Sequence, residues 1–253
     1  MTIRNSWSRS KPTSPPIFSI FSRNCARRKR VASPCAIRRC SLAASETSLN
    51  AWTPLAEPTN RHLKTAAYIG RHVWPPVVIA LILIATAFEL HRQGRFWTYS
   101  SCSNLLWTSD AWSSQTSQLF LDPYSFTHLL HGVMFAGVLA LLIRKLSASW
   151  RLVLVIATES AWEMIENSNT VIQRYREATA ALGYQGDTVL NSLGDIFCCA
   201  IGFSLAIKLG WRWSLVLFFT VEAILLFWIR DSLLLEILML IRPSSVIKHW
   251  QLS

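Results

Sequence analysis

Histidine and carboxylate side chains recur at helical spacing in two apolar stretches of the chain. His128 and His131 are three residues apart, so they share one face of a helix. Glu159, Glu163 and Glu166 follow at intervals of four and three residues, which again places them on one helical face. Two histidines with carboxylates can bind a divalent ion such as zinc, and a neighbouring glutamate can activate a bound water. This chemistry assigns His128 and His131 as metal ligands and Glu163 as the catalytic base.

A third stretch adds carboxylate and amide groups to the pattern. Asp187, Asn191 and Asp195 are each four residues apart and form another stripe on one helical face. The segment before this stripe contributes Arg174 and Arg176, whose guanidinium groups suit anions. These residues predict a pocket for a polar head group or an ion. The expected ligand-binding residues are Glu159, Glu166, Asn167, Arg174, Tyr175, Asp187, Asn191 and Asp195.

Three functions are compatible with these stripes. The first is a membrane protein whose polar cluster binds a polar ligand or ion. The second is a metal-assisted hydrolase that acts within the membrane on a lipid or envelope precursor. The third is a hydrogen-bonded network that fixes helix packing and holds no ligand. In the third case Glu222, in the middle of an apolar run, would pair with a neighbouring helix.

Five apolar runs must carry these side chains. A spanning helix needs about 20 mostly apolar residues. We therefore predict an all-α, polytopic transmembrane bundle of about five spanning helices. The predicted spans are residues 74–90, 128–145, 150–167, 189–209 and 213–230. Residues 232–241 are apolar but too short to span, so they are expected to form an interfacial helix or to extend the last span.

This order of spans brings the polar stripes together. Whichever way the protein is oriented, the start of the second span, the end of the third and the start of the fourth lie on the same membrane face. We therefore expect one polar site on one face of the bilayer. Small residues at Gly132, Gly194 and Gly202 are expected to allow close approach of helices.

Composition separates the first part of the chain from the rest. The 253 residues are 51% hydrophobic and 15% charged, with a net charge of +11. The whole positive excess lies in residues 1–72, which carry thirteen Lys and Arg against two Glu. Residues 1–70 are expected to be a disordered basic tail, a targeting segment, or sequence upstream of the true start. Residues 71–253 are expected to form the transmembrane domain.

Charge and cysteine usage exclude some functions. No basic stripe with interleaved aromatic residues follows residue 72, so nucleic acid is not an expected partner and the lipid bilayer is. The cysteines have no zinc-ligand spacing, and no disulfide framework is expected. The basic tail favours a cytoplasmic N-terminus. A divalent metal ion is the cofactor that the histidines and carboxylates would take.

Several longer motifs resemble a known family. The segments DPYSFTHLLHG at 122–132, EMIENS at 163–168, YREATA at 175–180, GYQGDT at 183–188 and NSLGD at 191–195 are similar to UPF0314, also called DUF2585. The resemblance spans roughly residues 75–252. It implies an uncharacterised, multi-pass protein of the bacterial inner (plasma) membrane, without an established activity. Asp187, Asn191 and Gly194 also resemble a D-x3-N-x2-G pattern of VanZ-like membrane proteins.

Overall fold

The computed structural model describes residues 65, 68, 70, 73–99, 106–181 and 183–253. The described residues all belong to one compact unit, residues 54–253. The predicted disordered tail therefore lies outside the described residues, except for Thr65, Tyr68 and Gly70, which are helical.

The described residues form seven helices, and their only β-type pairing is an isolated bridge between Trp107 and Leu121. The all-α prediction is therefore confirmed. The helices are α2 (Trp74–Arg92), α3 (Ser125–Leu142), α4 (Ala148–Glu166), α5 (Asn169–Ala178), α6 (Val189–Trp228), α7 (Leu233–Ile241) and α8 (Ser245–Leu252).

Three of the described helices are long and apolar enough to cross a membrane: α2, α3 and α6. Helix α4 has a similar length, 19 residues, but its composition includes Arg151, Glu159, Glu163 and Glu166. Apolarity alone therefore does not mark α4 as a span. The candidate spans indicate a membrane protein, and the number of crossings is considered below.

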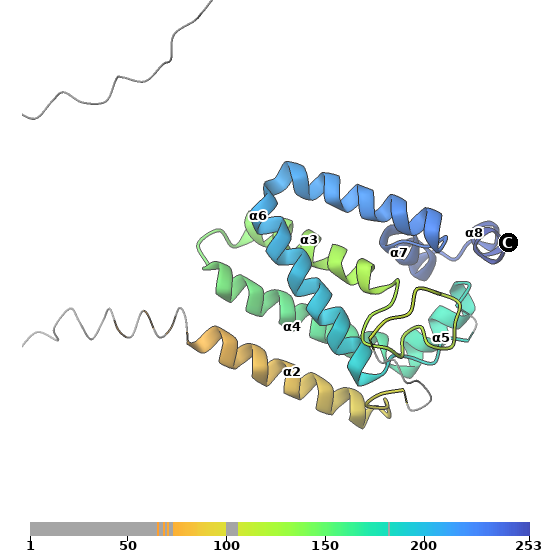
Figure 1. The fold of residues 1–253 in the computed structure, drawn as a ribbon, viewed down its shortest axis with the longest axis horizontal. Helices are drawn as coiled ribbons and strands as arrows, with labels where there is room; N and C mark the ends of the chain where they lie inside the picture. Colours follow the sequence, from red (N-terminus) through yellow and green to blue (C-terminus); the bar gives the residue numbers. More distant parts are fainter. Residues whose placement is uncertain (1–64, 66–67, 69, 71–72, 100–105, 182) are drawn as a thin grey trace, which may run out of the picture. The chain divides into compact units, whose positions relative to one another are not determined.

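Helices α2, α3, α4 and α6 form the bundle (Figure 1). Helix α3 packs mainly on α6, α2 packs on α4, and α4 also contacts α6. The buried core between α3, α4 and α6 contains Val133, Ala136, Val155, Cys199, Phe203 and Ala206. Several large apolar side chains on the outer faces, among them Leu81, Phe88 and Phe219, are instead exposed. An apolar exterior of this kind suits hydrocarbon.

Glycines set the distance between α3 and α6. A Cβ at Gly132 would lie 1.9 Å from the Cys199 carbonyl oxygen, and one at Gly202 would lie 1.9 Å from the Leu129 carbonyl oxygen. Both helices therefore depend on the absence of a side chain, as predicted. Gly194 also permits a close approach, but its neighbour is the Phe120 carbonyl oxygen, in the segment before α3.

Helix α6 contains a sharp break at Gly210. Its 40 residues would be about 60 Å long if straight, roughly twice the hydrocarbon thickness. Gly210 has φ 76° and ψ 169°, a conformation open to glycine and strained for other residues. The helix changes direction sharply here (Figure 1). The predicted spans 189–209 and 213–230 thus correspond to two arms of one kinked helix.

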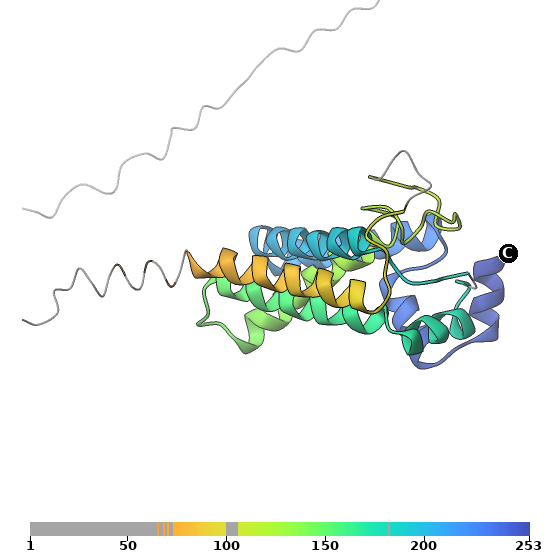
Figure 2. The same ribbon diagram turned by 90° about the horizontal axis from the view of Figure 1, so that it is seen from below.

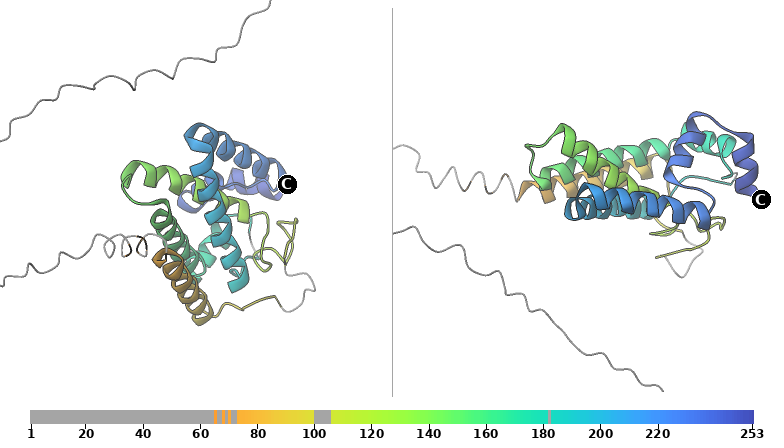
Figure 3. Two further views of the ribbon diagram at one scale, coloured as in Figure 1. Left: turned by 60° about the vertical axis from the view of Figure 1, so that its left-hand side comes forward. Right: turned by 90° about the horizontal axis from the view of Figure 1, so that it is seen from above.

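The ends of the helices that carry polar residues gather at one end of the bundle. The end of α2, the start of α3, the end of α4 and the start of α6 lie there beside α5, α7 and α8 (Figures 2 and 3). Backbone hydrogen bonds from Val189 to Phe96 and from Leu190 to Trp97, at 2.9 and 3.1 Å, join the start of α6 to the segment after α2. The polar stripes therefore gather at a common end of the bundle, and their expected place on one membrane face stays a prediction.

Helix α7 is separate from α6, so residues 232–241 do not extend the last span. Ser232 caps α7 by accepting a hydrogen bond from the Leu235 amide. The Leu234 amide, in the first turn of α7, donates a hydrogen bond to Glu222 of α6 at 3.3 Å. The negative carboxylate lies where the helix dipole is positive. Glu222 therefore meets a neighbouring helix, as one of the sequence interpretations proposed.

Candidate functional site

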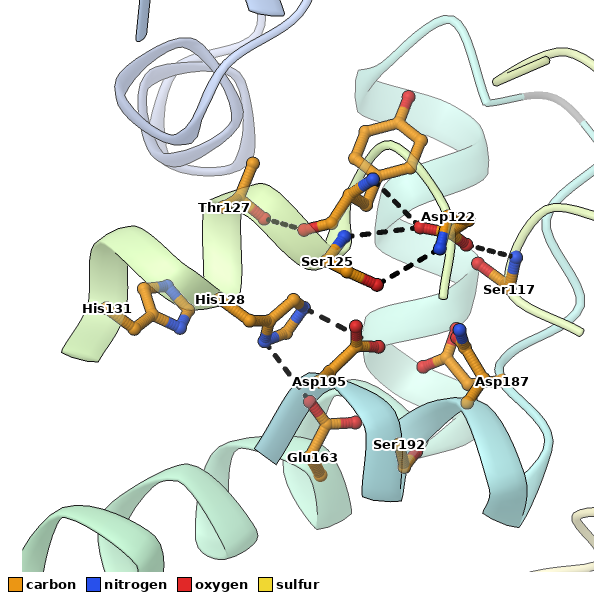
Figure 4. Close-up of polar contacts among 12 residues, drawn as sticks. Ser117, Asp122, Ser125, Thr127, His128, His131, Glu163, Asp187, Ser192 and Asp195 are labelled. Atoms are coloured by element: carbon orange, nitrogen blue, oxygen red, sulfur yellow. Dashed lines mark hydrogen bonds and ion pairs between the residues drawn. The ribbon is translucent and has the colours of Figure 1, made fainter. Parts of the chain in front are cut away.

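Five polar side chains from three helices meet inside the bundle. Helix α3 contributes His128 and His131, α4 contributes Glu159 and Glu163, and α6 contributes Asp195. We call these five residues the central cluster. They are between 0% and 9% exposed, so the protein encloses them. Figure 4 shows His128 directed toward Glu163 and Asp195, with His131 one turn farther along α3.

The start of α3 is fixed by an acidic cap. Asp122 accepts hydrogen bonds from the Tyr124 and Ser125 amides at 2.8 and 3.2 Å, and its own amide donates to the Ser125 hydroxyl at 3.1 Å. The Ser117 amide donates to the second oxygen of Asp122 at 2.6 Å (Figure 4). These bonds satisfy amides that the first turn of a helix leaves free. They hold His128, one turn later, in register.

Glu159 joins the two histidines. Its Oε1 lies 2.6 Å from His128 Nδ1 and 2.9 Å from His131 Nδ1. The two rings pack edge to face with their centroids 5.2 Å apart. His131 also packs against Trp162 and Phe135. Both rings are thus held by one carboxylate and by aromatic neighbours.

Glu163 and Asp195 have fewer partners. Glu163 Oε1 lies 3.3 Å from His128 Nδ1, and Asp195 Oδ2 lies 4.0 Å from His128 Nε2. Neither oxygen of Glu163 accepts a hydrogen bond from the described residues, and Asp195 Oδ1 does not either. A buried carboxylate without a donor is costly unless a cation or proton accompanies it. No Lys or Arg in the described part of the chain forms an ion pair with the cluster.

The described residues contain two groups that could hold a metal ion. One is His128, His131 and Glu159, and the other is His128, Glu163 and Asp195. In each group the potential ligand atoms lie within 4.8 Å of one another. Imidazole nitrogen and carboxylate oxygen together suit divalent transition metals.

A second polar network lies at the end of α4. Asn167 donates to Asp187 Oδ2 at 2.8 Å and accepts from the Asp187 amide at 2.7 Å. The same side-chain amide lies 3.1 Å from the Glu163 carbonyl oxygen and 3.4 Å from the Ser192 hydroxyl. Tyr184 adds a hydrogen bond to Asp187 at 3.0 Å. We call these residues the Asn167 network; none of the buried side-chain oxygens or nitrogens of Asn167 or Asp187 lacks a partner.

Asn191 belongs to a connection between α6 and the segment before α3. Its side chain donates to the Leu119 carbonyl oxygen at 2.7 Å, and Thr188, the cap of α6, donates to Gln118 at 3.0 Å. These bonds attach the start of α6 to the segment that caps α3. Asn191 therefore belongs to the predicted stripe with Asp187 and Asp195 by its spacing, but its side-chain amide donates to a backbone carbonyl oxygen.

Burial controls the ionisation of the groups around the Asn167 network. The pKa of Asp187 is raised mainly by burial, against the opposing effect of hydrogen bonds from Asn167 and Ser117. Burial also raises the pKa of Asp122, and the charge of Asp187 adds to this effect. The pKa of Tyr184 is raised well above its ordinary value for the same main reason. Burial therefore disfavours the charged form of each of these groups.

Glu166 and Tyr175 link the end of α4 to α5. Tyr175 lies close enough to Glu166 for their side chains to interact electrostatically, and the Tyr175 and Tyr184 rings pack with centroids 5.4 Å apart. One oxygen of Glu166 lacks a partner among the described residues. Both residues therefore border the Asn167 network.

The two predicted anion contacts have backbone acceptors. Arg174 donates twice to the Leu240 carbonyl oxygen at the end of α7, at 2.8 and 3.1 Å. Arg176 donates to the Tyr184 carbonyl oxygen. These bonds fasten α5 to α7 and to the segment before α6. Sequence reasoning could not identify these acceptors, because they lie far along the chain or in an irregular segment.

The sequence stripes did not include Asp122 and Ser117. The only signal for Asp122 was its place before Pro123 at a predicted helix start. Ser117 has φ 66°; its amide donates to Asp122 and its carbonyl oxygen accepts from the Thr188 amide at 3.0 Å, so it connects the α3 cap with the start of α6. No periodic pattern marks an irregular segment of this kind.

Comparison with known proteins identifies the relatives of this chain. The family model described as "Protein of unknown function (DUF2585)" matches residues 90–253. A UPF0314 protein of Paracoccus denitrificans is 39% identical over 171 residues, which cover 68% of this chain and 89% of that protein. A UPF0314 protein of Sphingopyxis alaskensis is 43% identical over 146 residues, covering 58% and 78% respectively. No solved structure matches the chain. The chain belongs to the UPF0314 (DUF2585) family.

Proposed function

We propose that this membrane protein binds a divalent cation in the central cluster. The observation that carries the proposal is Glu163, which is fully buried and has two oxygens without a hydrogen-bond donor in the described structure. Asp195 adds a third such oxygen. His128 places a ring nitrogen 3.3 Å from Glu163 and the other 4.0 Å from Asp195, and its ring can ligate a metal.

The charge of the cluster supports a cation. Glu159, Glu163 and Asp195 contribute three carboxylates, and the only described basic groups in contact with them are His128 and His131. With neutral histidines and ionised acids the formal charge is negative. A divalent cation offsets most of it, and the expense of burying charge within a bilayer favours such compensation.

The same observations weigh against the other two functions. A network that only fixes packing is expected to satisfy its buried acceptors, as the Asn167 network does. A hydrolase acting on a lipid needs access for a large substrate, whereas the five cluster residues are at most 9% exposed. A small ion fits this enclosure better. Glu163 would still be the base if a metal-bound water reacted there.

We also propose five membrane crossings, made by α2, α3, α4 and the two arms of α6, in the bacterial plasma membrane. The central position of α4 in the bundle and the break at Gly210 support this count. Cysteines introduced at exposed Lys145 and Gln173, in a cysteine-free background, should be labelled from opposite sides of the membrane. Labelling from the same side would contradict the five crossings.

The cation proposal is tested on the full chain purified in detergent. Bound elements are measured by mass spectrometry, and Zn²⁺ and Mn²⁺ binding to chelator-treated protein by calorimetry. We expect one ion per chain, and its loss in Glu163→Gln and Asp195→Asn. Folding of each variant is checked by circular dichroism and by gel filtration.

Glu222→Gln is the matched control, because Glu222 is also a buried α6 carboxylate with an unpartnered oxygen but lies outside the cluster. It should bind the ion like the parent protein. Folded parent protein that neither contains nor binds a divalent ion would refute the proposal. Equal loss in Glu222→Gln would show that the loss in the cluster variants is not specific to the cluster.

A further inference from the structure

The central cluster contains carboxylate contacts of two lengths. Glu159 lies 2.6 and 2.9 Å from the Nδ1 atoms of the two histidines. Glu163 and Asp195 lie 3.3 and 4.0 Å from His128. The lengths separate hydrogen bonds from contacts that could close around an ion. This separation rests on the proposed function and assigns a role to each carboxylate.

The short contacts are too short for two ligands of one metal. Ligands at about 2.0–2.1 Å from a tetrahedral zinc are about 3.3 Å apart. The Glu159 contacts are shorter than this and match charge-assisted hydrogen bonds. The 4.0 Å contact between Asp195 and His128 Nε2 leaves room for an ion. Glu163, whose 3.3 Å contact is with Nδ1, belongs to the same group, in which the potential ligand atoms lie within 4.8 Å of one another.

An ionised carboxylate only accepts hydrogen bonds, so each Nδ1 facing Glu159 must carry the proton. In a neutral ring the remaining lone pair is then on Nε2. His128 Nε2 faces Asp195. Ligating histidines commonly donate their other N–H group to a carboxylate in this way.

We propose that Glu159 is a positioning residue that fixes the Nδ1–H form of His128 and His131, and that His128 Nε2, Glu163 and Asp195 bind the metal. A set of one imidazole and two carboxylates suits Zn²⁺, Mn²⁺ or Fe²⁺ and disfavours Ca²⁺, which takes oxygen ligands alone. In this arrangement His131 donates its Nδ1–H to Glu159 and is not a metal ligand.

The proposal is tested by nitrogen NMR on the full chain labelled with ¹⁵N-histidine. Signals are assigned with His128→Asn and His131→Asn, and Zn²⁺ is then added to metal-free protein. We expect both residues in the Nδ1–H form and a Zn²⁺-dependent shift of Nε2 at His128 alone. In Glu159→Gln the Zn²⁺ affinity should fall roughly 10–100-fold while one ion per chain is still bound at saturation. In Glu163→Gln the Nδ1–H forms should remain although Zn²⁺ no longer binds.

The outcomes separate this proposal from the proposed function. Zn²⁺ binding with an Nε2–H or doubly protonated His128 would overturn the positioning role and leave the cation function standing. Unchanged Zn²⁺ affinity in Glu159→Gln would do the same. A direct Zn²⁺ shift at His131 Nε2 would overturn the ligand set. Nδ1–H forms without any Zn²⁺ binding would overturn the cation function and with it the ligand set.

Discussion

The central cluster and the Asn167 network are neighbouring polar regions that differ in how their acceptors are satisfied. Asn167 and Asp187 exchange two hydrogen bonds, and Tyr184 adds a third. Glu163, only four residues before Asn167, has no donor for either carboxylate oxygen in the described structure. Both regions contain buried carboxylates, so the presence of an acidic residue does not distinguish them. The supply of donors does, and it points to packing in one region and ion binding in the other.

The largest expected effect comes from breaking the helix contact on which both regions depend. Gly132→Ala would place a Cβ 1.9 Å from the Cys199 carbonyl oxygen, so α3 and α6 would have to separate. We expect loss of folded, membrane-inserted protein, measured by membrane fractionation and gel filtration in detergent. Gly137→Ala on the same helix is the control, since nothing lies within 4 Å of its Cβ. Equal behaviour of the two variants would contradict the close contact.

A substitution within the Asn167 network should reduce stability without abolishing ion binding. Asn167→Ala removes the donor to Asp187 and the acceptor for its amide. We expect a loss of about 2–4 kcal/mol in unfolding free energy, because buried groups of Asp187 lose their partners. Reversible unfolding in mixed detergent measures this, and exposed Asn169→Ala is the control. Complete loss of ion binding in a stably folded Asn167→Ala protein would contradict the assignment of packing to the Asn167 network and of ion binding to the central cluster.

A substitution in the central cluster is expected to change the unfolding free energy in the opposite direction. In metal-free protein, Glu163→Gln should be neutral or stabilising by about 1–2 kcal/mol, because it removes a buried charge that has no donor. Adding Zn²⁺ should stabilise the parent protein and not the variant. The measurement is unfolding free energy with and without Zn²⁺. Strong destabilisation of the metal-free variant would indicate that Glu163 has a structural role like that of Asn167.

A smaller effect is expected outside both regions, at Asp231. Burial raises its pKa to about 7, against a hydrogen bond from the Ser232 amide, with Glu222 nearby adding to the rise. Gln251 of α8 also bonds to Asp231, and Glu236 lies close enough to interact with it. The folded state therefore holds a proton that the unfolded state releases above its ordinary pKa of 3.8.

This contribution to stability is complete below pH 4 and is lost as the pH rises to about 7. The expected loss between pH 6 and pH 8 is on the order of 1 kcal/mol. Unfolding free energy at both pH values measures it, and Asp231→Asn should remove this part of the pH dependence. An unchanged pH profile in Asp231→Asn would assign the dependence to other groups, the central cluster among them.

Periodicity predicted much of the fold and the members of the central cluster. The all-helical class and the meeting of His128, Glu159 and Asp195 follow from spacing and from the order of apolar runs. A separate α7 was one of the two alternatives left open for residues 232–241. The close glycine contact between α3 and α6 was also predictable from residue size. These features depend on local sequence or on the order of the predicted spans, which decides which of their ends lie on the same side.

The sequence did not predict which polar residues meet one another and which bond to the backbone instead. Spacing grouped Asn191 with Asp195, yet Asn191 donates to the Leu119 carbonyl oxygen in an irregular segment. Arg174 was assigned to an anion, and its described acceptor is a carbonyl oxygen 66 residues later. Which acceptor a side chain meets depends on the tertiary placement of loops and short helices. No periodic pattern encodes that placement.

In the proposed five-crossing topology, the break at Gly210 also determines the side of the membrane to which the chain returns after α6. A rigid α6 would cross once and carry α7 and α8 away from α5. Two arms that insert as a pair return the chain to its starting side, so Lys248 can reach the Glu177 carbonyl oxygen at 2.8 Å. In this proposed topology, the conformation of this single glycine therefore decides on which side of the membrane α7 and α8 lie.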